Sequence, residues 1–534
     1  MTKYIFTTGG NLSSLGKGIA SAAIGRLLKS RGLKVTVLKM DPYLNVDAGT
    51  MNPFQHGEVF VTDDGAETDL DLGHYERFID INLSEVNNVT TGKVYDRVLR
   101  NEREGKYLGA CVQVIPHFTN ELKACIRNAA RASRAEVCIV EIGGTVGDIE
   151  GAPFYEAIRQ FRNEVGRDNA LFIHLSLVPT LTTAGEVKTK LTQHTVKELR
   201  GIGIQPDIIL CRAKAPLADD IKGKISLFCD VPVKCVISAP DVNDLYQIPV
   251  NFEKEGITEI ILDKLSLITD ENDMSEWTEM LKRQENPRGK CAIGICGKYF
   301  FKDAYMSVME ALKHGGIERR VSVDIKLIDT ETSALKNQLK KLDGILVPGG
   351  FGYRGIEGKI KAIQFARENG VPFLGICLGL QSAVIEFARN KCGLAAANST
   401  EFDDKTPHPV IDMMLEQRDI KDKGGTMRLG LYPAELKAGS LAAKLYKAKK
   451  IQERHRHRFE VNPKHHKVLQ QNGLVISGLS PDGKLAEIVE YPDHPYFIAA
   501  QFHPEFKSRP TRPHPLFAGL VGAAFEHAKG KKKD

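Results

Sequence analysis

A cysteine between two glycines is the residue with the clearest chemistry in this sequence. Residues 375–379 read Gly-Ile-Cys-Leu-Gly; they follow an apolar run at 372–374 and precede a helical pattern that runs from Leu380. A Gly-x-Cys-x-Gly turn between a strand and a helix is the cysteine analogue of the elbow that exposes a nucleophile above an α/β sheet. The helix N-terminus lowers the pKa of a thiol placed there. A cysteine that was only packed in a core would not need both glycines, so Cys377 is predicted to be a nucleophile.

A nucleophilic thiol needs a base, and a histidine near the end of the chain can provide it. Residues 501–505 read Gln-Phe-His-Pro-Glu and follow the apolar run 497–500. At such a strand end His503 could activate Cys377, while Glu505 fixes the tautomer of the imidazole. A lone histidine is more often a structural residue. The combination with an elbow in the same part of the chain favours a catalytic role instead.

Two further stretches could serve the substrate of this thiol. The turn Pro-Gly-Gly-Phe-Gly at 348–352 follows a strand-like run and offers backbone amides that, with the amide of Leu378, could stabilise an oxyanion. Residues 454–458 read Arg-His-Arg-His-Arg. The histidines suggest a metal cluster, but the neighbouring guanidinium charges would repel a cation, so recognition of a carboxylate or phosphate is the better interpretation.

A glycine-rich turn near the start of the chain has the composition of a phosphate-binding loop. Residues 9–18 read Gly-Gly-Asn-Leu-Ser-Ser-Leu-Gly-Lys-Gly, after the strand-like run 4–8 and before a helix rich in Ala and Ile. Backbone amides in such a turn and the positive end of the helix bind phosphate oxygens, and Lys17 adds a point charge. The loop departs from the usual pattern by one extra residue and by Gly18 in place of the metal-binding hydroxyl. The alternative is a glycine-rich turn with a surface lysine.

Because that hydroxyl is missing, a magnesium ion at this loop would need other oxygen ligands. Mg²⁺ favours carboxylates and substrate phosphates. Asp71 lies in the acidic run 67–74, and Glu141 ends the apolar run 137–140, so the two carboxylates could meet over bound phosphates. Each acid alone is more often a solvated residue or a helix cap, and the strand-end position of Glu141 is what favours a functional role.

Several lysines could neutralise additional phosphate charge. Lys39 ends the second strand-like run, and Lys188 and Lys190 lie close together further along the chain. Two triphosphates would need this much positive charge in one cleft. Any one of these lysines, taken alone, would more commonly be a surface residue.

Short apolar runs alternate with amphipathic helical patterns through most of the chain, which is typical of parallel α/β sheets. With 534 residues the chain is too long for one ordinary core. A charged stretch at 267–290 interrupts the alternation and is predicted to be a linker carrying one helix. The sequence therefore predicts two α/β domains: a P-loop-type domain with a parallel sheet at 1–266, and a second α/β domain with the thiol at 291–534.

The composition indicates an ordinary globular protein. Hydrophobic residues make up 42% and charged residues 26% of the chain, and the formal net charge of +6 is too small for this length to indicate nucleic-acid binding. The ten cysteines are scattered without a Cys-x-x-Cys pair, which predicts a reduced compartment. No secretory signal and no membrane-spanning apolar stretch is recognisable. We therefore expect a cytoplasmic location, with no membrane and no nucleic acid as partner.

The motifs also carry a resemblance to known families. The order Pro-Gly-Gly-Phe-Gly, Gly-Ile-Cys-Leu-Gly and His-Pro-Glu resembles class I glutamine amidotransferases. The N-terminal motifs resemble the CTP synthase family: Ser-Ser-Leu-Gly-Lys-Gly at 13–18, Asp-Pro-Tyr at 41–43, Gln-His-Gly-Glu-Val at 55–59, Asp-Leu-Asp-Leu-Gly-His-Tyr-Glu-Arg-Phe at 69–78 and Glu-Ile-Gly-Gly-Thr-Val-Gly-Asp at 141–148. The resemblance covers nearly the whole chain.

This resemblance implies an enzyme of pyrimidine nucleotide biosynthesis. It would be a carbon-nitrogen ligase in which an amidoligase (synthetase) domain aminates UTP to CTP with ATP, through a 4-phosphorylated UTP, and a glutamine amidotransferase domain releases the ammonia from glutamine. It further implies Mg²⁺ with the ATP, GTP as an allosteric activator, CTP as an inhibitor, a homotetramer and, in many members, filaments.

The resemblance assigns residues to each ligand. Cys377, His503 and Glu505 would be catalytic, and Asp71 and Glu141 would hold the metal. ATP would contact Ser14, Leu15, Gly16, Lys17, Gly18, Ile19, Lys39, Asp71, Pro240, Asp241 and Val242. UTP or CTP would contact Ser13, Asp148, Ile149, Glu150, Lys188, Thr189, Lys190, Leu191, Thr192, Gln193 and Lys224. Glutamine would contact Gly350, Leu378, Gly379, Leu380, Gln381, Glu401 and Arg458.

Two departures from the family pattern and three alternatives accompany these assignments. Leu191 stands where proline is usual, which affects the stiffness of the pyrimidine loop, and the segment from Arg418 to Gly424 is short. An amidotransferase of the cobyric acid synthase type would aminate a carboxylate instead. A nucleotide-switch ATPase of the partitioning type, or a scaffold that has lost catalysis, would be no ligase. Such switches usually carry a lysine near the start of the loop, where this chain has Thr7 and Thr8.

Overall fold

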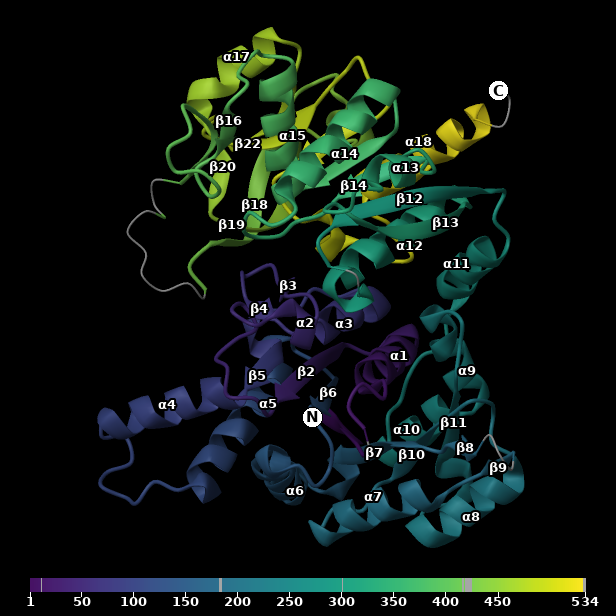
Figure 1. Cartoon of the computed structure of the whole chain (residues 1–534). Coiled ribbons are helices and arrows are strands. Elements are labelled where there is room, and N and C mark those ends of the chain that lie inside the picture. Colours follow the sequence, from purple (N-terminus) through teal and green to yellow (C-terminus); the bar gives the residue numbers. More distant parts are fainter. Residues whose placement is uncertain (11, 182–184, 300, 415–416, 418–424, 532–534) are drawn as a thin grey trace. The chain divides into compact units, whose positions relative to one another are not determined.

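The chain folds into two compact units. The computed structural model describes residues 1–10, 12–181, 185–299, 301–414, 417 and 425–531 (Figure 1). The first unit consists of Met1–Ala48 and Asp71–Ser275, and the second of Gly49–Leu70 and Glu276–Asp534. The later crossing falls inside the predicted linker, 267–290, which carries helix α11 (Ser275–Glu285). Residues 49–70 belong to the second unit, whereas the sequence predicted them to be part of the first domain.

The first unit is built on a seven-stranded parallel sheet with the order β11-β10-β7-β1-β6-β2-β5 (Figure 1). Its strands are buried apolar runs, as a sheet covered on both faces requires. In chain order they are β1 (Lys3–Gly9), β2 (Val35–Asp41), β5 (Asn88–Thr90), β6 (Val137–Ile142), β7 (Ala170–Leu177), β10 (Ile208–Ala213) and β11 (Val236–Pro240).

Helices cover this sheet. Apolar residues of α4, α5 and α6 form one core cluster with residues of β1 and β6, while α1 contacts α3 and α9. The helices are α1 (Lys17–Ser30), α3 (Asp71–Ile79), α4 (Thr91–Arg103), α5 (Thr119–Ala132), α6 (Ala152–Val165), α7 (Lys190–Gly201), α8 (Asp219–Cys229), α9 (Ile248–Lys254) and α10 (Ile257–Leu265), and a short hairpin pairs β8 (Thr180–Leu181) with β9 (Glu186–Val187).

The second unit has a nine-stranded mixed sheet with the order β13-β12-β14-β15-β23-β22-β21-β18-β19. The first five strands are parallel, and the strands from β22 onward pair antiparallel. The strands are β12 (Lys290–Gly297), β13 (Ser322–Asp329), β14 (Gly344–Val347), β15 (Phe373–Ile376), β18 (Arg428–Leu436), β19 (Lys450–His457), β21 (Val475–Leu479), β22 (Ala486–Glu490) and β23 (Phe497–Ala500); β16 (Ala397–Ser399), β17 (His408–Met413) and β20 (Phe459–Val461) form a small separate sheet.

Two apolar clusters give this second sheet its core. One includes residues of α12 (Met306–Arg319), α16 (Leu441–Tyr446) and α18 (Pro515–Gly530), and the other residues of α13 (Leu335–Leu339), α14 (Ile356–Asn369), α15 (Leu378–Asn390) and α17 (His466–Gln471). The two clusters contain alternate residues of the same strands, as expected for the two faces of one sheet.

The segment 49–70 joins the second unit through charged and aromatic contacts. It contains α2 (Pro53–His56) and a hairpin of β3 (Phe60–Val61) and β4 (Glu67–Thr68). Arg454 and Arg456 on β19 reach it: Nε of Arg454 lies 2.6 Å from Oδ1 of Asp63, and Nε of Arg456 lies 2.7 Å from Oε1 of Glu67. The ring of Phe60 packs edge-on against Phe506, with centroids 5.0 Å apart. These arginines of the basic stretch therefore bind carboxylates of the chain itself.

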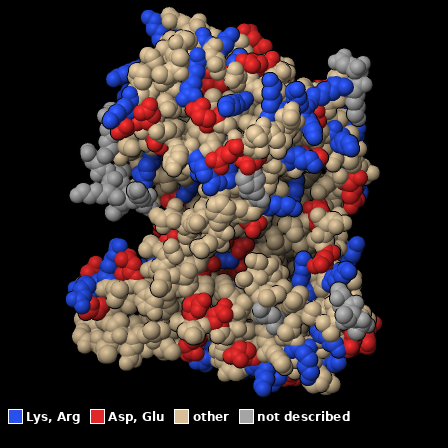
Figure 2. Space-filling model, viewed as in Figure 1, with Lys and Arg blue, Asp and Glu red and all other residues tan. Residues whose placement is uncertain are grey.

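Charge is distributed without a dominant sign on the visible face of either unit. Lys and Arg side chains there are interspersed with Asp and Glu side chains (Figure 2). None of the described helices has the length and apolar character needed to cross a membrane.

Candidate active sites

The turn between β15 and α15 presents Cys377 in a strained backbone conformation. Cys377 has φ 52° and ψ −104°, which a residue with a side chain rarely adopts. The glycines on either side are required by close packing. A Cβ atom on Gly375 would lie 2.8 Å from the backbone of Gly379, and one on Gly379 would lie 2.1 Å from the carbonyl oxygen of Val347. The turn therefore has the geometry of a nucleophile elbow.

His503 and Glu505 lie beside this elbow because β23 runs parallel to β15. Nδ1 of His503 is 2.7 Å from Oε1 of Glu505. Both Cys377 and His503 face Gly349: a Cβ atom built there would be 2.8 Å from Cε1 of His503 and 3.6 Å from Cβ of Cys377. Burial opposes charge on the imidazole, but the Glu505 carboxylate and the sulfur of Cys377 raise the pKa of His503 to about 10. An imidazole with this pKa is a strong base, and it can hold a proton taken from a neighbouring thiol.

A cavity of about 510 Å³ opens onto this pair. Its wall includes the glycine turn at 349–351 together with Arg456 and Arg458. Part of the lining comes from the early segment of the second unit: Gly49, Thr50, Met51, Pro53, Glu58 and Val59. Sequence reasoning placed none of these six residues near the thiol, and only the contacts of the folded chain reveal them.

One buried lysine beside this site was also missed from the sequence. The side chain of Lys359 on α14 is 1% exposed, and its Nζ lies 3.8 Å from the position of a Cβ atom on Gly350. Its ammonium makes no hydrogen bond or ion pair with the residues that the structure describes. Burial, together with the like charge of Lys298, lowers the pKa of Lys359 to about 8. A lysine in a helix gives no sequence signal of such burial.

In the first unit, the glycine-rich loop leads into α1 and buries its lysine. Nζ of Lys17 donates to the carbonyl oxygen of Gly144, 2.6 Å away, in the turn that follows β6. A Cβ atom on Gly18 would lie only 2.1 Å from Oδ1 of Asp71. The carboxylate of Asp71 thus takes the space in which an ordinary P-loop carries its Ser or Thr side chain. This close approach explains why residue 18 is glycine.

Lys39, Asp71 and Glu141 form one buried cluster beside Lys17. Lys39 and Glu141 are register partners on the neighbouring parallel strands β2 and β6, so their side chains lie on the same face. Nζ of Lys39 is 3.0 Å from Oε1 of Glu141 and also donates to Asp71, and Tyr75 donates to the other oxygen of Glu141. Strand β6 continues through Glu141 to Ile142, two residues beyond the apolar run.

The protonation of this cluster follows from burial and pairing. Burial raises the pKa of Glu141. Asp71 and Glu141 outweigh burial at Lys39 and raise its pKa well above the ordinary value. Lys39 in turn holds the pKa of Asp71 below its usual value against the effect of burial.

The donor set suits a magnesium ion held together with substrate phosphates. Two carboxylates converge on the loop, and Mg²⁺ needs only one or two protein carboxylates because phosphates and water supply the remaining ligands. Within the described ranges, no group of three or more His, Cys, Asp and Glu side chains is placed to hold a metal by itself. The residues present therefore fit a metal that arrives with a nucleotide.

Comparisons with known proteins identify the family of this chain. Residues 3–267 match the family model "CTP synthase N-terminus", and residues 300–523 match "Glutamine amidotransferase class-I". The CTP synthase of Carboxydothermus hydrogenoformans is 60% identical over 99% of this chain and 100% of its own, and that of Bacillus subtilis is 56% identical over 99% and 100%. The chain belongs to the CTP synthase family. This membership sets aside the cobyric acid synthase type and the nucleotide-switch ATPases. The glutaminase domain of the Trypanosoma brucei enzyme, solved with bound acivicin, aligns at 39% identity over 44% of this chain and 94% of that chain, with a TM-score of 0.41.

Several residues assigned to ATP from the family resemblance meet in one place. A cavity of about 220 Å³ in the first unit is lined by Ser14, Leu15, Gly16, Ile19 and Pro240. Arg212, which the sequence did not single out, lines the same cavity and lies 2.9 Å from Asp241. Lys17, Gly18, Lys39 and Asp71 belong to the neighbouring cluster described above, and Val242 follows Asp241 directly.

Most of the residues assigned to UTP or CTP lie in the turn that contains Asp148 or at the start of α7. Oδ2 of Asp148 accepts a hydrogen bond from the amide of Thr145, and Ile149 and Glu150 follow on the surface. Residues 188–193 lie at the start of α7, whose Glu198 approaches Gly147 in the same turn as Asp148. Within this stretch Lys188 pairs with Glu186, Gln193 donates to Thr189, and Lys190 lies over the ring of Phe228. Thr192 is buried and Leu191 is 39% exposed. The two remaining residues lie elsewhere and are exposed: Lys224 on α8 and Ser13 in the glycine-rich loop.

The residues assigned to glutamine surround the elbow. Glu401 accepts a hydrogen bond from the amide of Gly352, 2.8 Å away, and burial raises its pKa. Arg458 donates to Gln417 and to Thr426, at 2.6 Å and 2.8 Å. Gly350 lies in the glycine turn at 349–351. Leu378, Gly379, Leu380 and Gln381 form the first turn of α15, which begins two residues before the predicted start at Leu380. The short segment at 418–424 lies outside the described residues.

Proposed function

We propose that this chain performs the reaction of the CTP synthase family, the glutamine-dependent amination of UTP to CTP, with one chemical step in each unit. The second unit releases ammonia from glutamine, and the first unit uses ATP to activate O4 of UTP. The observation that supports this most strongly is the cavity that Cys377 and His503 share, in a chain that also folds a phosphate-binding loop around Lys17.

In the second unit, we propose acyl transfer to the thiol. The proton of Cys377 passes to Nε2 of His503, the sulfur attacks the carboxamide carbon of glutamine, and the amides of the glycine turn and of Leu378 stabilise the oxyanion. His503 returns the proton to the leaving nitrogen, so that ammonia departs and a thioester remains. Water then hydrolyses the thioester to glutamate and restores the thiol. Glu505 holds the imidazole throughout with its hydrogen bond to Nδ1.

In the first unit, we propose phosphoryl transfer from ATP to O4 of UTP, followed by displacement of that phosphate by ammonia. Lys17 and the loop amides bind the triphosphate, and Lys39 stabilises the charge that develops on the transferred group. Asp71 and Glu141 would hold Mg²⁺, which supplies positive charge for the phosphate oxygens. Pro240, Asp241 and Val242 would contact the adenine ring of ATP.

The remaining parts of the proposal rest on the family resemblance alone. They are activation by GTP, inhibition by CTP at the residues assigned to UTP, and a homotetramer, with filaments as in many members of the family. A cytoplasmic location is proposed from the scattered cysteines and the composition of the chain. Sedimentation of the purified chain with and without UTP and ATP tests the tetramer.

A change of nitrogen source tests whether ammonia release and CTP formation take place at separate sites. Replacement of Cys377 by Ala is expected to abolish CTP formation from glutamine and to leave CTP formation from added ammonia at the wild-type rate, because only the first unit is then needed. CTP is resolved from UTP by chromatography. Loss of both activities in a folded variant would contradict two separable sites, and CTP formation from glutamine by this variant would exclude the thiol mechanism.

A further inference from the structure

In addition to His503, the sulfur of Cys377 has a hydrogen-bond donor and a hydrogen-bond acceptor nearby. Nε2 of Gln501 is 3.7 Å from Sγ, and the carbonyl oxygen of Arg456 is 3.8 Å away on β19. A thiol can donate its proton to that carbonyl oxygen, whereas a thiolate has no proton and requires donors. The Gln501 amide is therefore a contact, separate from the imidazole, that favours the reactive form of the sulfur.

The orientation of the Gln501 side chain follows from its neighbour Gln381. Nε2 of Gln381 is 2.8 Å from the carbonyl oxygen of Phe459, which can only accept. This fixes the amino end of Gln381, and that same nitrogen is 3.3 Å from Oε1 of Gln501. The carboxamide oxygen of Gln501 is thus engaged as an acceptor, so that its NH₂ group faces the sulfur.

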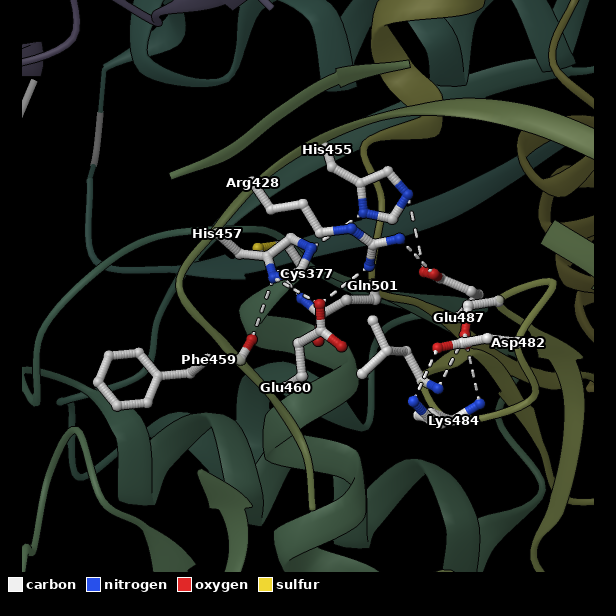
Figure 3. Close-up of polar contacts among 12 residues, drawn as sticks. Cys377, Arg428, His455, His457, Phe459, Glu460, Asp482, Lys484, Glu487 and Gln501 are labelled. Atoms are coloured by element: carbon white, nitrogen blue, oxygen red, sulfur yellow. Dashed lines mark hydrogen bonds and ion pairs between the residues drawn. The ribbon is translucent and has the colours of Figure 1, made fainter. Parts of the chain in front are cut away.

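His457 also contacts the carbonyl of Phe459, and His455 in turn contacts His457. Nδ1 of His457 is 3.1 Å from the oxygen of Phe459, so Nδ1 carries the proton, and Nε2 of His457 then accepts from Nδ1 of His455 at 2.9 Å (Figure 3). Burial and the neighbouring Arg428 hold the pKa values of both histidines well below the ordinary value. Both rings are therefore neutral at physiological pH, and each has one defined tautomer.

Arg428 anchors this buried network with two carboxylates. Its Nη1 is 2.9 Å from Glu460 and its Nη2 is 2.7 Å from Glu487 (Figure 3). The backbone connects the two ends, since the amide of Gln501 donates to the carbonyl oxygen of Glu487 at 2.9 Å. Gln501 itself is fully buried. A side chain held at its amide, at its backbone and by the walls of the core cannot turn its NH₂ group away from the sulfur without breaking other contacts.

We propose that Gln501 is a further catalytic residue, whose side-chain N–H donates to Sγ of Cys377 and stabilises the thiolate before it attacks glutamine. Gln381 and the His455–His457 pair act as positioning residues that keep this donor in place. The inference rests on the proposed glutaminase function and extends it by one group that is separate from the imidazole and from the oxyanion turn.

The physical basis is the preference of an anion for a donor in a dry site. A hydrogen bond to a charged group contributes roughly 1.5 to 3 kcal/mol, which corresponds to about a tenfold to a hundredfold change in the thiolate population. Burial of Gln501 strengthens such a bond, because the effective dielectric constant around the donor is low.

The test measures the reactivity of the thiol across pH in the full-length chain. Gln501→Met has a similar volume but no donor, and Gln501→Glu has nearly the shape of the native side chain but places a carboxylate against the sulfur. We expect the rate of alkylation by iodoacetamide at neutral pH to fall about tenfold in the Met variant and further in the Glu variant, with the midpoint of the pH profile moved upward. Glutamine hydrolysis is expected to fall in the same order, while CTP formation from ammonia stays unchanged.

A matched control separates this effect from general damage to the core. Ser382 lies on α15 next to Gln381, and its buried hydroxyl has no hydrogen-bond partner among the described residues. Ser382→Ala is expected to leave the alkylation profile unchanged. A purely structural role for Gln501 predicts that Glu, the closest in shape, is tolerated best, and that outcome would overturn the proposal. An unchanged pH profile in Gln501→Met would also overturn it. The proposed function is tested separately by Cys377→Ala, and it fails if this variant still forms CTP from glutamine or, while folded, loses CTP formation from ammonia as well.

Discussion

The two active sites of this chain handle charge in opposite ways. Around Lys17 in the first unit, an ammonium and carboxylates neutralise one another: Lys39 bridges Asp71 and Glu141, and Asp41 lies 3.8 Å from the same nitrogen. Around Cys377 in the second unit, the sulfur has glycine amides, a carboxamide and the His503–Glu505 pair close to it, while Arg456 and Arg458 lie in the cavity wall. The first site is suited to a highly charged ligand, and the second presents a neutral amide group to the sulfur with charged side chains further out in the cavity.

The two sites also differ in how their geometry is fixed. In the first site the charges balance one another, so a polyphosphate with its metal would have to replace existing ion pairs. The second site holds its geometry in advance, since the positive φ of Cys377 and the packing of Gly375 and Gly379 exist without a ligand. Substitutions in the two units are therefore expected to fail in different assays.

The largest effect is expected from Lys17→Ala. Loss of the ammonium removes the point charge that binds the triphosphate, so CTP formation from glutamine and from ammonia is expected to fall about 10³-fold or more. Glutamine hydrolysis, measured as glutamate release, is expected to continue. Lys34→Ala is the matched control, because Lys34 is exposed beyond the end of α1. Normal ligation by the Lys17 variant would remove this loop from the mechanism.

A smaller loss in the same unit is expected from Gly18→Ser, although serine is the residue that an ordinary P-loop carries. The added Cβ atom would meet Oδ1 of Asp71 at 2.1 Å and push the carboxylate away from its place. A misplacement of this size costs about 10²-fold in ligation with either nitrogen source. Gly223→Ala, where a Cβ atom meets nothing within 4 Å, is expected to have no effect. A fully active Gly18→Ser variant would show that Asp71 is not needed at this position.

In the second unit, Glu505→Gln tests the ion pair. The carboxamide retains the shape but not the charge that raises the pKa of His503 to about 10. The imidazolium is the form present below that pKa, so a lower pKa means that His503 loses its proton at lower pH. We expect glutamine hydrolysis to fall about 10- to 10²-fold at neutral pH, and its high-pH limb to move downward by about one unit or more. An unmoved high-pH limb would mean that another group controls it.

Much of each site could be predicted from sequence because its parts lie at strand ends. Cys377 and His503 are far apart in the chain, but both follow buried apolar runs, and the parallel pairing of β15 with β23 brings such ends together. The same rule brought Glu141 next to Lys39. Gly18 was informative as well. Because it lacks the hydroxyl that binds the metal in an ordinary P-loop, the sequence predicted that a carboxylate such as Asp71 would take this role.

Other parts had no sequence signal because long-range packing alone creates them. Residues 49–70 pack with the second unit through the pairs of Asp63 with Arg454 and of Glu67 with Arg456, and charged residues of this kind are usually solvated. Gln501 precedes His503 in a motif that drew attention only to its histidine and its acid. Its contact with the sulfur depends on Gln381, which lies 120 positions earlier in the chain.

The smallest effect concerns stability, and it compares one lysine from each unit. Lys39 is paired, and its pKa is raised; Lys359 is buried without a partner among the described residues, and its pKa falls from 10.5 to about 8. Below pH 8 Lys359 is charged in the folded and the unfolded chain, so the full penalty of burial is present. Between these two values the unfolded chain binds one proton more than the folded chain, so stability rises with pH. Lys359→Met is therefore expected to stabilise the second unit by on the order of 2 to 3 kcal/mol at pH 7, and this gain is expected to vanish near pH 10.5. Thermal unfolding at both pH values measures it, with Lys361→Met on the exposed side of the same helix as the control. A gain of equal size at both pH values would attribute the effect to packing and not to charge.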